Sequence, residues 1–243
     1  MNESRKRTDV QDLRFYGRPF SDAEGSWPKD VRRRMNRRAM RVVAGHLGPL
    51  QRLRFLWRFF LARRRARGID LTRFRKRGLN NERFINTQLN YLALFVTLQD
   101  ITNTERAIEI AKDVMEKTAK EPLLLCLPPQ EDVRATGAPF EVFRQYLRAM
   151  PAAACSGGCH EMRISEDTPD TFQFDVTWCV WLELSRAMRV PDACLPNCYS
   201  DDLVFPDYFG ALGIKYKRTQ TLAGGGRYCD FRFERSSGET RNS

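Results

Sequence analysis

Two strand-like runs near the end of the chain, joined by a glycine-rich turn, constrain the fold more than any other segment. Successive side chains of a strand point to opposite faces, so alternate residues of each run share one face. That face collects Ile214, Tyr216, Arg218, Gln220, Leu222, Cys229, Phe231 and Phe233. A turn over residues 223–226 fixes the facing pairs, which are Gln220 with Cys229, Arg218 with Phe231, and Tyr216 with Phe233. The runs predict an antiparallel hairpin with one largely apolar face.

Arg218 is the unusual member of this face, because most of its neighbours are aromatic or aliphatic. A guanidinium that is removed from water needs a carboxylate or another acceptor, since an unpaired buried charge is strongly destabilising. Either the protein supplies that anion, in a structural ion pair beneath the sheet, or a bound ligand supplies it. The sequence leaves both interpretations open.

Short motifs in a fixed order carry a resemblance to a known family. They are Trp178-Cys179, Cys198-Tyr199-Ser200-Asp201-Asp202, Arg218-Thr219-Gln220-Thr221-Leu222 and Gly226-Arg227-Tyr228-Cys229-Asp230-Phe231. Over roughly residues 140–235 the chain resembles the L-2-amino-thiazoline-4-carboxylate hydrolase-like family, which takes its name from a ring-opening hydrolase. The last motif is also similar to the vinyl-4-reductase-like small-ligand domains, which bind rather than catalyse. The resemblance implies a fold and a ligand pocket.

With this resemblance, the residues suggest a hydrolase-like enzyme that opens the ring of a small cyclic C–N compound bearing a carboxylate. Arg218 would hold the substrate carboxylate as a bidentate partner, and Gln220 and Cys179 would be further substrate-binding residues. Cys198 or Cys229 would be the nucleophile or a ligand, and Asp201 would be the base. The alternative is a non-catalytic small-ligand-binding or accessory protein that docks on a membrane or a partner through its basic helices.

The same residues also have structural interpretations, and the sequence predicts no cofactor. Asp201 or Asp202 fits an N-cap of the helix that follows, and free cysteines are commonly small buried hydrophobes. Gly224-Gly225-Gly226 lacks the following helix that a phosphate-binding loop needs. Zinc or another thiophilic metal would use Cys159, His160, Cys198 and Cys229, but the close cysteine pairs are spaced Cys-x3-Cys rather than Cys-x2-Cys.

The positive charge of the chain is concentrated near its N-terminus. The net charge is +11, and residues 31–69 alone contain 13 arginines and no acidic residue. Ser26, as a cap with Pro28 in the first turn, predicts one helix start, and Pro49 predicts a second. In the second helix Leu50, Leu53, Trp57 and Phe60 recur at helical spacing and form an apolar stripe.

Three interpretations of this basic segment stay open. We favour packing of the stripe against the rest of the chain or against a second subunit of a homo-oligomer, with the arginines in solvent. Residues 31–67 could instead lie in an anionic membrane interface. Contact with nucleic acid has the least support, because no recognition motif accompanies the arginines.

The rest of the pattern predicts an α+β fold, with a helical N-terminal part followed by an antiparallel sheet with flanking helices. We expect a loose segment over residues 1–25, an arginine-rich helical extension over 26–68, an α+β hydrolase-like domain over 80–235 and a disordered tail over 236–243. The N-terminus lacks the apolar stretch of a secretory signal, and no apolar run is long enough to span a bilayer. We therefore expect a cytoplasmic protein, if anything peripheral to a membrane.

Overall fold

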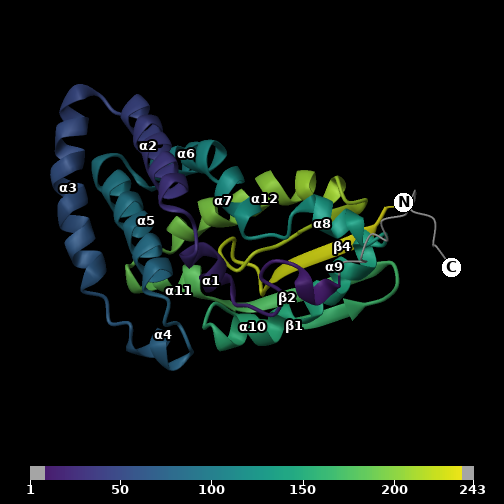
Figure 1. Ribbon diagram of the computed structural model, residues 1–243. Helices are drawn as coiled ribbons and strands as arrows, with labels where there is room; N and C mark the ends of the chain where they lie inside the picture. The colour runs from purple at the N-terminus through teal and green to yellow at the C-terminus, as the bar shows by residue number, and fades with distance from the viewer. Residues whose placement is uncertain (1–8, 237–243) are drawn as a thin grey trace.

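A four-stranded antiparallel sheet in the order β1-β2-β4-β3 forms the centre of the fold. The computed structural model describes residues 9–236. The strands are β1 (His160–Asp167), β2 (Thr171–Cys179), β3 (Ile214–Lys217) and β4 (Cys229–Arg235). The helices are α1 (Phe20–Gly25), α2 (Lys29–His46), α3 (Pro49–Arg67), α4 (Thr72–Lys76), α5 (Glu82–Ile101), α6 (Thr104–Thr118), α7 (Lys120–Leu125), α8 (Gln130–Ala135), α9 (Pro139–Arg148), α10 (Met150–Ser156), α11 (Val180–Ala187) and α12 (Cys194–Gly210), with the 3-10 turns η1 (Val10–Asp12) and η2 (Pro191–Ala193). The predicted α+β class is confirmed (Figure 1).

The two faces of the sheet differ as the alternation predicts. Phe174 of β2 and Phe233 of β4 share the buried face with Cys229 and pack against aromatic side chains of α9 and α12. The opposite face carries ion pairs, among them Arg163 with Asp175. One face of the sheet is therefore available to enclose an apolar cavity.

The closing hairpin follows the predicted register only where the strands pair. Tyr216 pairs with Phe233, as predicted. β3 ends at Lys217, so Arg218 leaves the ladder, although its Cζ still lies 5.3 Å from the ring centroid of Phe231. In the loop that follows, hydrogen bonds to polar side chains replace the backbone hydrogen bonds between the strands.

Asp230 is the residue that organises this loop. Its Oδ1 accepts the backbone N–H groups of Thr219 at 2.9 Å and Gln220 at 2.8 Å. Gln220 therefore does not pair with Cys229 in the ladder, which corrects the sequence-based pairing. The Asp230 carboxylate therefore has a structural role in this loop.

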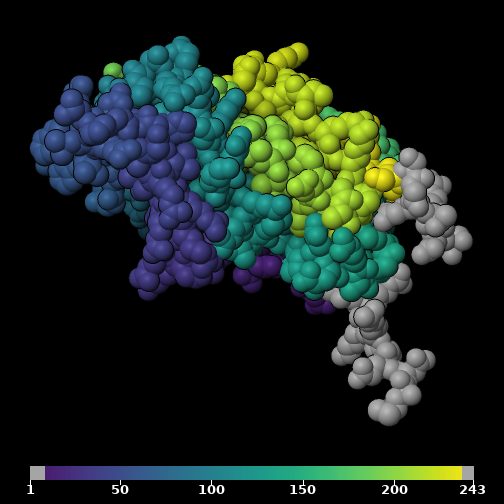
Figure 2. All heavy atoms as spheres, turned by 90° about the horizontal axis from the view of Figure 1, so that it is seen from above, coloured from purple at the N-terminus to yellow at the C-terminus, as the bar shows by residue number. Residues whose placement is uncertain are grey.

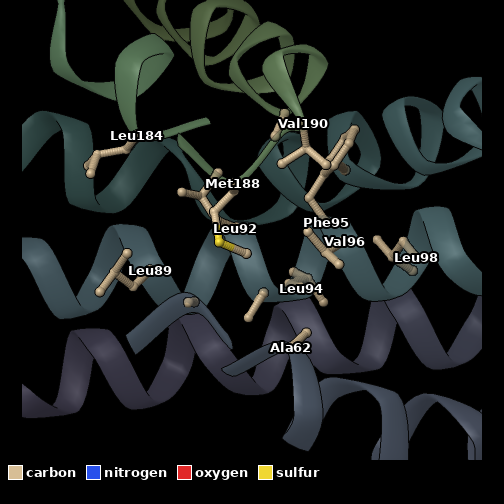
Figure 3. Close-up of a cluster of buried hydrophobic side chains, with 14 of the residues drawn as sticks. Ala62, Leu89, Leu92, Leu94, Phe95, Val96, Leu98, Leu184, Met188 and Val190 are labelled. Carbon is tan, nitrogen blue, oxygen red and sulfur yellow. The ribbon is translucent and has the colours of Figure 1, made fainter. Parts of the chain in front are cut away.

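Helices α2 and α3 share a hydrophobic core with α5, α6 and α11. Figure 3 shows part of it, with Ala62 of α3 on one side of α5 and Met188 and Val190 on the other. α5 begins after Asn81, whose side chain accepts the Phe84 N–H at 3.1 Å. The arginine-rich segment therefore does not stand apart as an extension but completes the packing of the central helices.

α3 begins at Pro49 as predicted, but its apolar stripe does not pack against the rest of the described chain, and packing against a second subunit stays a prediction. The four stripe residues remain exposed, at 80% for Leu50, 70% for Leu53, 64% for Trp57 and 60% for Phe60. The opposite face of the helix is buried instead, through the set Phe55, Ala62 and Ala66. The two small alanines let α3 approach α5 closely, so this face and not the stripe is the inner one.

The segment before α2, expected to be loose, packs onto the rest of the chain from residue 9 onward. Leu13 is 3% exposed and joins the core on the apolar face of the sheet. α1 lies so close to the start of α5 that a Cβ at Gly25 would be 2.4 Å from Asn81 Nδ2. Glycine at this position therefore allows α1 to dock. The predictions for residues 1–8 and 237–243 concern residues outside the described range.

Two helix starts differ from the sequence expectation. α2 has Pro28 rather than Ser26 at its N-cap. α12 begins at Cys194, so Asp201 and Asp202 lie within the helix and neither is its N-cap. None of the helices formed by residues 9–236 has the length and apolar character to cross a membrane.

Candidate functional site

A cavity of about 620 Å³ lies between the apolar face of the sheet and helices that include α1, α5, α11 and α12. Most of its lining consists of aromatic and aliphatic side chains. Its polar lining includes Glu24, Gln88, Tyr91, His160, Cys179, Cys194, Cys198, Asp201, Arg218 and Cys229. A largely apolar cavity with a few converging polar groups is the usual form of a small-molecule site.

Arg218 connects the end of β3 to the middle of α12. Its side chain is 3% exposed, and its guanidinium donates to Asp201 at 2.8 Å and to Asp202 at 2.7 Å. It also donates to the carbonyl oxygen of Cys198 at 2.5 Å. Burial lowers the pKa of Arg218, but the two aspartates more than offset this and raise it above its ordinary value. The protein therefore supplies an anion for this cation, one of the two alternatives that the sequence left open.

Asp201 is held at the cavity by this ion pair. Burial raises the pKa of Asp201 to about 6, although the charge of Arg218 acts in the opposite direction. A carboxylate with this pKa is ionised at neutral pH and can still accept a proton readily, as a general base must.

Cys179 has the environment that best favours a thiolate. It is the N-cap of α11, where the helix dipole stabilises negative charge. Hydrogen bonds from Cys194, His160 and the Leu182 N–H hold the pKa of the Cys179 thiol well below its ordinary value, against the opposing effect of burial. The thiol of Cys194, which faces Cys179 and Cys198, has its pKa raised and keeps its proton.

Of the other candidate residues from the sequence, some lie at the cavity and one does not. Cys198 and Cys229 line the same cavity as Cys179. Burial raises the pKa of Cys229 to about 12, so this thiol stays protonated near neutrality and is a poor nucleophile. Gln220 is not part of the cavity lining, because its side-chain oxygen accepts the Arg227 N–H at 3.1 Å. These placements favour Cys179 as the nucleophile and argue against Gln220 as a substrate contact.

The residues considered for zinc do not converge. In the part of the chain that the structure describes, no group of three or more His, Cys, Asp or Glu side chains is arranged to hold a metal ion. Cys159 is fully buried and its thiol points to the Gly157 carbonyl oxygen at 3.6 Å. All seven cysteines are free thiols.

Glu24 is the cavity residue that sequence reasoning missed. It comes from α1, it is 7% exposed, and its carboxylate accepts the Gln88 side-chain N–H at 2.7 Å. Burial raises the pKa of Glu24 to about 8, so that the carboxyl group is protonated at neutral pH. Its local sequence carries no signal of this role, because its burial depends on how α1 docks on α5.

Comparison with known proteins gives one match. The family model described as L-2-amino-thiazoline-4-carboxylic acid hydrolase matches residues 83–233. No curated protein and no solved structure matches the chain. The matched range contains Cys179, Asp201 and Arg218, whereas Glu24 lies outside it.

Proposed function

This chain belongs to the L-2-amino-thiazoline-4-carboxylic acid hydrolase family, and we propose that it hydrolyses a small cyclic C–N compound bearing a carboxylate, with opening of the ring. One observation carries the proposal. The cavity combines a thiol of lowered pKa, Cys179, with a carboxyl group of pKa about 6, Asp201, and another of pKa about 8, Glu24. Between these two values one group is a base and the other an acid, which is the division of roles that hydrolysis needs.

In the first half of the proposed reaction, the Cys179 thiolate attacks the ring carbon that is double-bonded to nitrogen. A C–S bond forms and the electron pair of the C=N bond moves to the nitrogen, which takes a proton from Glu24. The bond from this carbon to the ring nitrogen then breaks as the lone pair of the amino substituent on the same carbon forms a new C=N bond, and the leaving ring nitrogen takes a second proton from solvent. The ring is now open, and its former ring carbon remains attached to the sulfur.

In the second half, water attacks the same carbon and gives one proton to Asp201. The carbonyl group forms, the second proton of the water returns to Glu24, and the C–S bond breaks to release the Cys179 thiolate. Asp201 then loses its proton to solvent. The net change is the addition of one water to the substrate.

Arg218 has two roles in this proposal. Its bonds to Asp201, Asp202 and the Cys198 carbonyl hold the base in place. These bonds use three of the five N–H donors of a guanidinium and leave two outside them. We propose that the substrate carboxylate accepts the remaining donors.

The direct test is to incubate the purified protein with L-2-amino-thiazoline-4-carboxylate and with related cyclic amidine and amide carboxylates. Liquid chromatography with mass spectrometry should show a product heavier by one water, and rapid quenching should trap a mass adduct on the peptide that contains Cys179. The variant Cys179→Ser should form neither, whereas Cys155→Ser, at an exposed thiol outside the cavity, should behave as wild type. A ligand that raises the melting temperature but is never converted would instead identify a binding or accessory protein.

A further inference from the structure

The outward face of α3 is the most apolar exposed surface of the described chain. Eight large hydrophobic side chains are exposed in residues 9–236, and six of them belong to α3: Leu50, Leu53, Leu56, Trp57, Phe60 and Leu61. They extend along several turns of one helix. Large exposed apolar patches of this kind mark interaction sites rather than ordinary surface.

The exposed apolar side chains lie on the side of α3 that points away from the core. At 100° per residue, Leu53, Trp57 and Phe60 lie opposite the buried set Phe55, Ala62 and Ala66. α3 therefore has two apolar faces, one that packs on α5 and one that faces solvent. Figure 1 shows α3 at the outer edge of the molecule, and Figure 2 shows that the segment with α2 and α3 forms one end of it.

Exposed arginines border the apolar stripe. Arg54 and Arg65 flank it along one side of α3, and Arg64 continues it at the C-terminal end. Among the described residues, none of these three arginines has a carboxylate partner. The neighbouring helix α2 adds further unpaired exposed arginines, such as Arg37 and Arg41. The surface therefore combines hydrophobic area with positive charge that the protein itself does not neutralise.

We propose that α3 docks this chain on an anionic lipid bilayer, with the helix lying in the plane of the membrane surface. Leu53, Trp57 and Phe60 enter the boundary between headgroups and acyl chains, while the flanking arginines contact lipid phosphates. An anionic bilayer supplies both an apolar phase and negative charge, so that it complements both properties of the surface at once.

A second copy of the chain fits this surface less well. In a two-fold symmetric dimer the same patch meets itself, so the arginines of one copy would face the arginines of the other. The segment 31–69 has no acidic residue to offset this repulsion. Nucleic acid would pair with the arginines but leave the leucines and Trp57 in water.

The proposal is tested by sedimentation of the full-length protein with phosphatidylcholine vesicles, with and without phosphatidylserine, at low and at physiological salt. We expect binding to the anionic vesicles, a decrease with salt, and little binding to the neutral ones. The variant Leu53→Ser/Trp57→Ser/Phe60→Ser should weaken binding by about tenfold or more, because three apolar contacts are lost. Its melting temperature should not fall, since all three side chains are already exposed.

A matched pair of variants separates local charge from net charge. Arg54→Gln/Arg65→Gln should weaken vesicle binding, whereas Arg83→Gln/Arg227→Gln removes the same charge at exposed positions outside α2 and α3 and should have a smaller effect. Equal effects of the two pairs, or unchanged binding of the serine variant, would overturn the proposal. Absence of binding to anionic vesicles would also overturn it. So would a dimer, detected by analytical ultracentrifugation, that only the serine variant dissociates.

Discussion

Replacement of Glu24 by Gln should make the protein more stable at neutral and alkaline pH. The carboxyl group is buried in the cavity wall with the Gln88 amide as its hydrogen-bond donor, and burial raises its pKa from 4.5 to about 8. In the unfolded chain the group ionises near 4.5. Between these two values the folded state keeps a proton that the unfolded state releases, so the free energy of unfolding falls as pH rises through this window.

The size of the effect follows from the shift. A pH of 7 is about 2.5 units above the pKa of Glu24 in the unfolded chain and still below its pKa of about 8 in the folded chain. At 1.36 kcal/mol per pH unit, the free energy of unfolding at pH 7 is therefore on the order of 3 kcal/mol lower than at acidic pH. Above pH 8 the loss is complete. A glutamine has no charge to bury, so Glu24→Gln removes the penalty while keeping the size and a hydrogen-bonding group.

Urea unfolding at a series of pH values from 4.5 to 8 measures this difference. Glu24→Gln should match wild type at the acidic end and gain stability progressively towards pH 8. Glu105→Gln, at an exposed position, is the matched control for the loss of a carboxylate. A constant difference between Glu24→Gln and wild type across the whole range would refute the reasoning. In the enzyme assay, Glu24→Gln should also lose the alkaline limb of the kcat/KM profile, which reports the acid of the free enzyme.

Three other experiments test the site and the packing. Arg218→Met should cost roughly 3–5 kcal/mol in urea unfolding, because it leaves the buried Asp201 unpaired, and adding Asp201→Asn should recover part of this loss; a wild-type midpoint for the single variant would contradict the ion-pair role. Alkylation by iodoacetamide below pH 8 should modify Cys179 faster than Cys229 when the rates are read by peptide mass spectrometry, and the reverse order would contradict the pKa difference between them. Deletion of residues 1–68 should give aggregates on size-exclusion chromatography, since it uncovers the part of α5 that α3 buries, and a soluble, stable monomer would show that the two cores are independent.

The sequence predicted those features that depend on local periodicity. The pairing of Tyr216 with Phe233 followed from side-chain alternation, and Pro49 marked the start of α3. Periodicity could not decide which apolar face of α3 is buried, because both faces carry large side chains at helical spacing. That choice depends on Ala62 and Ala66, whose small size permits close contact with α5.

The site was less predictable because its geometry is non-local. Cys194 was not among the candidate residues drawn from the sequence, yet within α12 it lies one helical turn before Cys198, which places both thiols at the cavity. Arg218 was expected to need an anion, but only the fold shows that the aspartates of α12 provide it. The preference for Cys179 as nucleophile arises because β2 ends where α11 begins, a junction that places this residue at the N-cap position of α11.

The N-terminal part of the chain has a larger role in the site than the family match alone indicates. The match covers residues 83–233, yet the carboxyl group proposed as the acid comes from α1, which contacts the start of α5 through the hydrogen bond from Asn81 Nδ2 to Asp22 Oδ1 at 3.3 Å. Because α2 follows α1 after only three residues and leads directly into α3, the same segment that closes the cavity also presents the apolar stripe at the surface. The proposed chemistry and the proposed membrane docking therefore depend on one continuous stretch of chain. In Gly25→Ala the new Cβ would lie 2.4 Å from Asn81 Nδ2, so either the Asn81 side chain, which caps α5, or α1 itself must shift. This should disturb the environment of Glu24 while leaving the exposed face of α3 unchanged, so that turnover falls and vesicle binding does not.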